Sequence, residues 1–555
     1  MIFSKSPNWA IRGIDKDIYK FFILRWQEIL DENTFDAWQV RFSDICCILN
    51  ELHNAAEVAE LVHISHPNLK LLIDEALQIV KRDKLIAESY PFLSNYLRKL
   101  NELYDSRVRD KKDKDIDDFI RLVTVTQGNL NSYGETLIKT ISDILVTQPE
   151  KYKIDLYNLI MSLGVHLKSK GYSMPFLRES INILTDSKAG DFQNRFLKMV
   201  KLYEGNENEY SCRFFVTVPE GIPIEAIDQI QFTYDRPNGD DTTEEENEFY
   251  NQDSQALIAI IKIRALDIYS ARDNSEKLIE SFFAKCFLYK PTKKAHIKHP
   301  LVLVTLSDGS KNCIGPDTSW QGYIRDFRKS DSQIVELSNI QKRLPLRDSS
   351  QLSASLQYHK LALSAKTEDA RLVNLWIALE SLVQTEGISA IERICTYIPA
   401  SNSSGYIYRM MKALAISINS IWRHSETGEL CKLLKYSKYQ LHPEDMLRIL
   451  LDDTDGPLIT SFYDLIKDNP LLTFRIHHMR TDFFQNATKL ANILKGNKKN
   501  IDWQLRRIYR VRNNVMHQGI CLPGTRQLIQ HLHSYYIFAI HNLIYDLKNN
   551  PNWTI

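Results

Sequence analysis

The chain has 555 residues, of which 44% are hydrophobic and 25% charged, so it falls in the ordinary globular class and is too long for a single hydrophobic core. Lysine and arginine number 70 against 69 aspartates and glutamates, which excludes a globally basic, histone-like binder of nucleic acid. The N-terminus lacks the apolar core of a signal peptide, and no apolar run approaches the ~20 residues of a membrane helix. We therefore expect a cytoplasmic protein that makes no contact with a membrane.

The cysteines and histidines suggest no metal chemistry. The 8 cysteines are scattered without a C-x-x-C pair, and Cys46 and Cys47 are adjacent, a usage typical of reduced intracellular thiols. His53, His63 and His66 lie close together, but their spacing is not that of a helical pair of ligands. The sequence predicts no metal site and no cofactor.

The first expected domain, residues 1–204, is helical. Apolar residues recur at helical spacing from about residue 15 to residue 203, and proline and glycine are sparse. The paired-helix rhythm is typical of a bundle or a solenoid, although no repeat period is evident. The region is long and carries no motif of its own, so we expect it to have a sensing or regulatory role.

The second expected domain, residues 205–345, is a small α+β domain. The acidic stretch Asp235–Glu248 predicts a solvated loop, and residues 254–289 predict a return to helix. Strands are expected where β-branched and aromatic residues cluster, at Ser211–Val218, Ile230–Tyr234 and Leu301–Leu306.

The third expected domain, residues 346–555, is an all-α bundle. The fold class is therefore mainly α: an N-terminal helical domain, a small α+β middle domain and a C-terminal helical bundle. The expected helices of the bundle include Leu352–Leu363, Arg371–Val383, Leu471–Leu494, a helix ending near Gly519, and Arg526–Leu547.

The helix that ends near Gly519 is basic and amphipathic. Its apolar stripe comprises Leu505, Ile508, Val511 or Val515, and Met516. Arg506, Arg510, Asn513 and His517 recur at three and four residues on the other face. Gly519 is a suitable C-cap, and Pro523 prevents continuation of the helix.

The polar face carries residue types that suit cleavage of RNA. Histidine titrates near neutral pH and can donate or accept a proton, and arginine binds two phosphate oxygens at once. Asparagine can orient a phosphate oxygen, and this chemistry needs no metal ion. A local basic patch lies on and beside this polar face and predicts contacts with RNA from Lys498, Lys499, Arg506, Arg507 and Arg510.

Two stretches resemble HEPN-domain proteins, most closely the Apea-like HEPN branch. The first is Arg512-Asn513-x-x-x-His517, preceded by Ile508-Tyr509 and followed by Gly519. The second is Leu372–Val383, which contains the Leu-Glu-x-Leu sequence around Glu380 and resembles the helix that opens the domain. The resemblance covers the last third of the chain.

The resemblance implies an all-α bundle that is usually dimeric and a metal-independent endoribonuclease activity. Its members include toxins and effectors of bacterial antiphage defence and abortive infection. It implies that His517 is the general acid or base, that Arg512 holds the scissile phosphate and that Asn513 orients it. Tyr509 would guide RNA, and Glu380 would either support His517 or Arg512 or have a structural role.

The resemblance also implies the partners. They are RNA, with tRNA as one candidate substrate, a second copy of the chain with the two motif helices facing each other, and an unidentified trigger or antitoxin. Some members of the family have lost catalysis, so the alternative is a non-catalytic module that binds RNA or protein.

Overall fold

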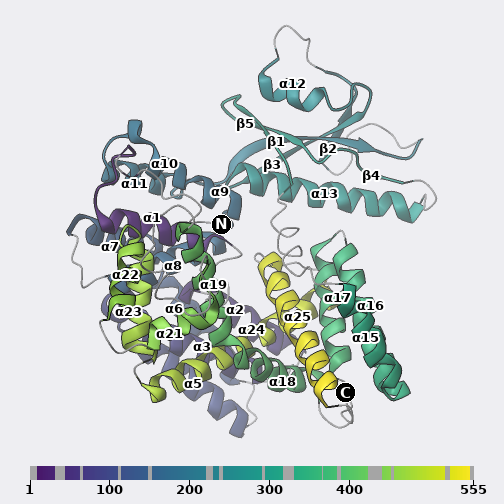
Figure 1. The fold of residues 1–555 in the computed structure, drawn as a ribbon. Coiled ribbons are helices and arrows are strands. Elements are labelled where there is room, and N and C mark those ends of the chain that lie inside the picture. The colour runs from purple at the N-terminus through teal and green to yellow at the C-terminus, as the bar shows by residue number, and fades with distance from the viewer. Residues whose placement is uncertain are drawn as a thin grey trace. The chain divides into compact units, whose positions relative to one another are not determined.

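The computed structural model describes most of the chain. The described residues are 9, 11–31, 44–62, 67–110, 114–147, 153–220, 229–236, 242–289, 294–316, 331–365, 367–383, 389–422, 440–451, 456–484, 486–518 and 525–550. The protein is mainly helical, with one small antiparallel sheet in the middle of the sequence (Figure 1). The predicted fold class is therefore confirmed.

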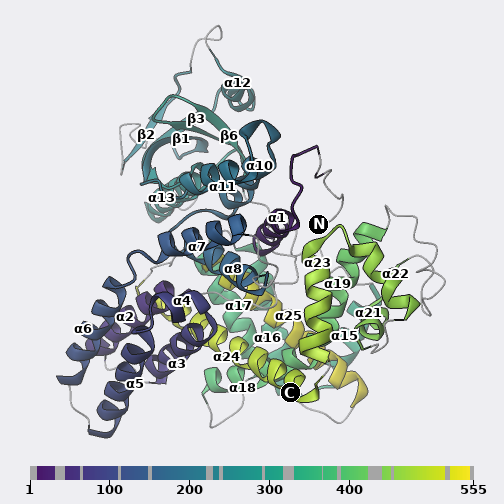
Figure 2. The same ribbon diagram turned by 90° about the vertical axis from the view of Figure 1, so that its left-hand side faces the viewer.

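The N-terminal region is helical, as predicted. Its helices are α1 (Asp17–Ile29), α2 (Ile45–Val62), α3 (Pro67–Arg82), α4 (Lys84–Ser89), α5 (Leu93–Asp110), α6 (Lys114–Gly128), α7 (Tyr133–Thr147) and α8 (Lys153–Ser169). Helices α2, α3, α5 and α6 pack into one group (Figure 2), and α8 packs against α1 and α7. Each helix buries an apolar stripe, as in α7, where Leu137, Ile141 and Ile144 lie inside.

The next region contains short helices and then the sheet. The helices are α9 (Met174–Glu179), α10 (Ile181–Thr185), the 3-10 turn η3 (Ser187–Ala189) and α11 (Phe192–Lys201). The strands are β1 (Asn208–Thr217), β2 (Ile230–Thr233), β3 (Leu257–Ala265), β4 (His296–Ile297), β5 (Val302–Leu306) and β6 (Lys311–Ile314). Strand order is β2-β3-β1-β5-β6, with β4 also paired to β1, and every pair is antiparallel.

Each face of the sheet is covered by a helix (Figure 1). Helix α13 (Ile268–Tyr289) packs Phe282 and Phe283 against one face. Helix α12 (Glu244–Tyr250) places Phe249 on the other, where its ring stacks on that of Phe215 with centroids 4.3 Å apart. Burial on both faces explains why the strands are so rich in isoleucine, valine and phenylalanine.

Two predictions for this region are wrong. Residues 254–289 were expected to be helical, but Leu257–Ala265 is strand β3, which pairs with both β1 and β2. The expected acidic loop Asp235–Glu248 contains the start of α12, which begins with a capping box between Thr243 and Glu246. Glu246 is buried and pairs with Lys311 at 2.7 Å, so this acidic residue is part of the packed structure.

The C-terminal region is helical, as predicted. Its helices are α15 (Asp331–Arg343), α16 (Leu346–Ser364), α17 (Glu368–Leu382), α18 (Ala390–Ser404), α19 (Tyr406–Trp422), α21 (Pro443–Leu451), α22 (Pro457–Ile466), α23 (Pro470–His478), the π-helical η5 (Met479–Phe484), α24 (Ala487–Gln518) and α25 (Thr525–Asn549). Helix α17 packs against α16, α24 and α25, and α18 packs against α24 and α25. Helices α19, α21 and α22 share a separate core that contains Met446 and Phe462.

The chain divides into two compact units, residues 1–169 with 325–555 and residues 170–324. This division differs from the three expected domains at 1–204, 205–345 and 346–555. The short helices before the sheet belong with the sheet because Asp267, at the start of α13, accepts bonds from the backbone N–H and hydroxyl of Ser173, both at 2.8 Å. Among the described helices, none has the length and apolar character needed to cross a bilayer.

Candidate functional site

The motif lies at the C-terminal end of α24, a helix much longer than the sequence pattern indicated. Leu505, Ile508 and Val511 are buried, as predicted for the apolar stripe, but Met516 is 52% exposed. Arg512, Asn513 and His517 fall within about two turns of the helix end. The helical backbone of His517 is described, whereas its side chain, Gly519 and Pro523 lie outside the described residues.

Arg512 and Asn513 contact each other. The Nη1 of Arg512 donates a hydrogen bond to Oδ1 of Asn513 at 3.0 Å. The Nε of Arg512 is buried and has no hydrogen-bond partner among the described residues. A buried N–H without a partner is costly, so this atom would gain from a bound acceptor such as a phosphate oxygen.

The two stretches that carry the family resemblance meet in the bundle. The ring of Tyr509 on α24 lies 5.5 Å from that of Trp376 on α17, centroid to centroid. Trp376 is fully buried, and its Nε1–H donates to Oε1 of Glu380 at 2.6 Å. Glu380 therefore supports Trp376, and no described contact links it to Arg512 or Asn513. Tyr509 is half-buried, and its contact with Trp376 leaves its ring less available to RNA.

The arginines of the predicted basic patch are bound to acidic side chains. Arg507 donates to Oε1 of Glu51 at 2.7 Å and to both carboxylate oxygens of Glu75 at 3.0 Å. Arg510 donates to the other oxygen of Glu51 at 3.0 Å. We name these four residues, Glu51, Glu75, Arg507 and Arg510, the α2–α3–α24 clamp, after the helices that carry them.

Arg507 is the buried member of the clamp, its three partners are partly buried, and the four charges depend on one another. Arg507 is only 4% exposed. Burial disfavours its charged form, but the carboxylates of Glu51 and Glu75 outweigh that effect and raise the pKa of Arg507. At Glu75 burial dominates and raises the pKa of the carboxyl group. A guanidinium held in this way is not available to a phosphate, so the structure does not place Arg507 on an RNA-binding face.

The remaining basic residues of the patch lie at the surface or near it. Arg506 pairs with Asp502 one turn earlier, at 3.1 Å. Lys498 and Lys499 are exposed, and the ammonium of Lys499 lies 4.7 Å from the ring centroid of Trp503. Of the five residues predicted to bind RNA, the two lysines are thus the most accessible.

Sequence patterns could not have revealed Glu51 and Glu75. They lie 456 and 432 residues from Arg507, on helices whose charge pattern is ordinary for a solvated face.

One cavity of about 270 Å³ is lined by residues around Asp83, and another of about 340 Å³ is lined by residues around Asn194. Neither of these two cavities includes a residue of α24.

The chain was compared with known proteins. No protein-family model, no curated protein sequence and no solved structure matches it. The class defined by the fold and site is therefore a mainly helical protein with a sheet-containing unit, whose C-terminal bundle carries Arg512, Asn513 and His517 at the end of a long helix.

Proposed function

We propose that the chain is a metal-independent endoribonuclease that acts as an effector or toxin in bacterial antiphage defence. The observation that carries the proposal is the Arg512–Asn513 pair on the helix that also contains His517. The buried Nε of Arg512 has no hydrogen-bond partner among the described residues. The proposal also rests on the resemblance of these residues to the HEPN motif, and α17 and α24 pack together in a helical bundle as that resemblance implies.

Each residue has a role in the proposed reaction. His517 accepts the proton of the RNA 2′-hydroxyl or donates one to the leaving 5′-oxygen. Arg512 binds the scissile phosphate and stabilises the charge that develops on it. The Oδ1 of Asn513 already accepts a bond from Arg512, so its amide group is left to donate to a phosphate oxygen. Attack by the 2′-oxygen leaves a 2′,3′-cyclic phosphate and a free 5′-hydroxyl.

The cell must be protected from such an enzyme, and the N-terminal helices offer a restraint. In the α2–α3–α24 clamp, Glu51 on α2 binds Arg507 and Arg510, and these bonds fix α24 just before the motif. In the proposal, an unidentified trigger or an antitoxin partner changes this restraint in the cytoplasm. The active form is a homodimer in which the two motif helices face each other and share one RNA.

The test is cleavage of total RNA and tRNA by the full chain in the presence of a chelator. We expect wild type to generate ends with 2′,3′-cyclic phosphates, and we expect His517→Ala and Arg512→Ala to reduce the rate at least about 100-fold, the size typical of losing an acid–base or charge-stabilising group. Lys489→Ala is the matched control, because it removes an exposed charge near the start of the same helix, far from the motif and from the predicted RNA-binding residues.

Two outcomes would reject the proposal. One is equal cleavage by wild type and His517→Ala. The other is salt-sensitive binding of RNA by wild type without any product, both alone and after the clamp is opened by Glu75→Gln. The second outcome would support the alternative, a non-catalytic module that binds RNA.

A further inference from the structure

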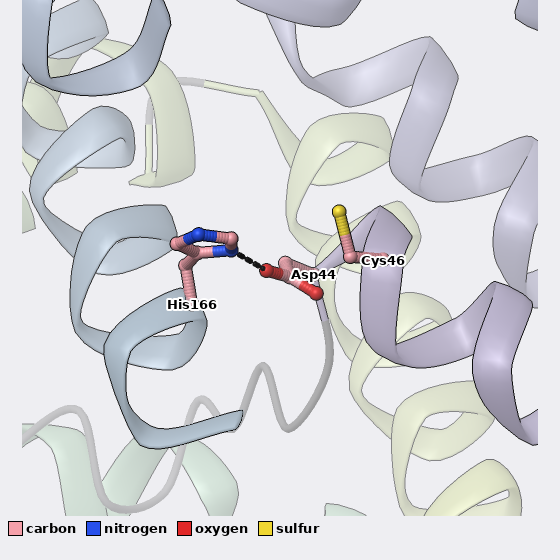
Figure 3. A group of neighbouring side chains, drawn as sticks. All are labelled: Asp44, Cys46 and His166. Atoms are coloured by element: carbon pink, nitrogen blue, oxygen red, sulfur yellow. Dashed lines mark hydrogen bonds and ion pairs between the residues drawn. The ribbon is translucent and has the colours of Figure 1, made fainter. Parts of the chain in front are cut away.

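Three side chains with different donor atoms converge at the start of α2. They are Asp44, which precedes the helix, Cys46 in its first turn and His166 on α8 (Figure 3). One oxygen, one sulfur and one nitrogen from these residues all lie within 4.8 Å of one another. The carboxylate of Asp44 lies between the imidazole and the thiol (Figure 3).

The cluster is held in place from several sides. The Oδ1 of Asp44 accepts the backbone N–H of Cys47 at 2.7 Å and so caps α2, while its Oδ2 lies 2.9 Å from Nδ1 of His166. The side chains of Asp44 and His166 are 0% and 8% exposed. On the far side of the ring, a Cβ at position 134 would lie only 2.5 Å from Nε2, so Gly134 makes room for the imidazole.

The surroundings are rich in acidic groups. The ring of Tyr133 lies 5.5 Å from that of His166, centroid to centroid, and its hydroxyl donates to Oδ2 of Asp83 at 3.5 Å. Asp83 itself accepts a hydrogen bond from Ser162 at 3.3 Å. The Nε2 of His166 is buried and has no hydrogen-bond partner among the described residues. Buried carboxylates beside a thiol and an imidazole form a site that a bound cation would stabilise.

We propose that Asp44, Cys46 and His166 bind a zinc-class divalent metal ion. Carboxylate oxygen, thiolate sulfur and imidazole nitrogen are the ligands of Zn²⁺ and Co²⁺, whereas Ca²⁺ and Mg²⁺ prefer oxygen alone. Ligand atoms at about 2.0–2.3 Å from one Zn²⁺ lie roughly 3.3–3.7 Å from one another. On binding, the oxygen of Asp44 and the nitrogen of His166 therefore move slightly apart from 2.9 Å, and the sulfur of Cys46 moves closer to them. A fourth, tetrahedral position remains for another ligand.

The proposed ion ties α2 to α8 at the end of α2 that precedes Glu51. The ion therefore also positions the carboxylate that holds Arg507 and Arg510. This site does not depend on the proposed nuclease activity, because its ligands belong to the N-terminal helices and none of them is in the motif.

Metal binding is tested with the full chain, after any polyhistidine tag has been removed. The metal-free protein is titrated with Co²⁺ and with Cd²⁺, and the thiolate-to-metal absorption is recorded. We expect wild type to bind one ion per chain with a tetrahedral cobalt spectrum, and Cys46→Ser to lose the thiolate band. Cys47→Ser is the matched control, because it removes the adjacent thiol and keeps the three ligands. His166→Gln is expected to weaken binding at least tenfold.

A second measurement uses wild type alone, in case a variant does not fold. Zn²⁺ is expected to slow alkylation of Cys46 at least tenfold, as followed by peptide mass spectrometry. The proposal is overturned if wild type shows no thiolate band with excess Co²⁺, if the band persists unchanged in Cys46→Ser, or if Zn²⁺ leaves the alkylation of Cys46 unchanged. Any of these results would leave Asp44 and His166 as a hydrogen-bonded pair that only joins two helices.

Discussion

Arg507 and Arg512 lie on the same helix and differ only in their surroundings. Arg507 is buried, and two carboxylates occupy its donors. Arg512 is half-buried and contacts Asn513, and its Nε has no hydrogen-bond partner in the part of the chain that the structure describes. The sequence assigned a phosphate-binding role to both. The structure shows that residue type alone cannot separate an arginine that holds helices together from one with a donor to spare.

Two stacked histidines set a pH limit on stability. The Nε2 atoms of His359 on α16 and His533 on α25 are 3.1 Å apart, and the ring of Tyr536 stacks on His359. Burial lowers the pKa of His359 to about 4, and burial with the neighbouring His359 lowers that of His533 to about 3. Both rings are therefore neutral in the folded protein at neutral pH.

We expect acid to destabilise the protein through this pair. The unfolded chain takes up protons as the pH falls below about 6.5, and the folded chain does so only near the lowered values. The contribution of the two neutral histidines to the free energy of unfolding is therefore complete above about pH 6.5. It is lost as the pH falls toward 4, by up to about 1.4 kcal/mol per pH unit for each histidine. Urea unfolding of wild type and His359→Gln between pH 7 and 4.5 measures the slope, which should be shallower in the variant. Identical slopes would contradict the prediction.

At the scale of the elements, local patterns predicted helices better than strands. Ser211, Ile230 and Leu301 begin stretches that were predicted as strands and largely are strands. In contrast, the isoleucine-rich Leu257–Ala265 was assigned to a helix, because a short apolar run fits a buried strand and a buried helix equally well. Its pairing with β1 and β2 decided the outcome, and that pairing is not local.

The clamp between α2, α3 and α24 gives a test at this scale. We expect Glu75→Gln and Arg507→Met to be coupled in a double-mutant cycle by about 1–3 kcal/mol, because each single change leaves a buried charge with fewer partners. Urea denaturation of the four proteins measures the coupling. Asp502→Asn is the control, since its pair with Arg506 is partly exposed and is worth at most about 1 kcal/mol.

Additive effects of the two substitutions would show that the clamp does not stabilise the fold as a unit. The same variants also address the proposed restraint. A faster RNA cleavage by Glu75→Gln than by wild type is expected if the clamp holds the motif helix inactive. An unchanged rate would limit the clamp to a structural role.

At the scale of the whole chain, a buried Arg–Glu–Arg cluster joins the first helix to the C-terminal region. Glu28 on α1 binds Arg25 at 3.0 Å and accepts two bonds from Arg475 on α23. The guanidinium of Arg25 lies 3.5 Å from the ring centroid of Tyr157, whose hydroxyl accepts from Arg475 at 3.2 Å. The cluster helps to explain why residues 1–169 and 325–555 form one compact unit.

We expect Glu28→Gln to be strongly destabilising. The change removes the carboxylate that the buried guanidinium groups of Arg25 and Arg475 share, and breaking a comparable buried pair costs about 3–5 kcal/mol. The free energy of unfolding from urea titration checks this value. Glu88→Gln, in an exposed pair with Lys84, is the control and should cost at most about 1 kcal/mol. Equal effects of the two substitutions would show that the cluster does not stabilise the unit.

By itself, the sequence determined the mainly helical class, the helical N- and C-terminal regions and three of the six described strands. It also determined a motif helix whose apolar residues Leu505, Ile508 and Val511 are buried. These features follow from local spacing, and the period of apolar residues encodes that spacing directly. The role of Arg512, Asn513 and His517 in RNA cleavage remains a proposal built on residue types and resemblance.

Only the tertiary structure decided which charges meet. Asp44 and His166 are 122 residues apart, and Arg510 and Glu51 are 459 apart. Attraction between charges depends on their distance and burial in the folded chain, and neither quantity leaves a periodic trace in the sequence. For that reason no sequence pattern predicted the clamp or the proposed metal site, although sequence patterns did predict the helices that carry them.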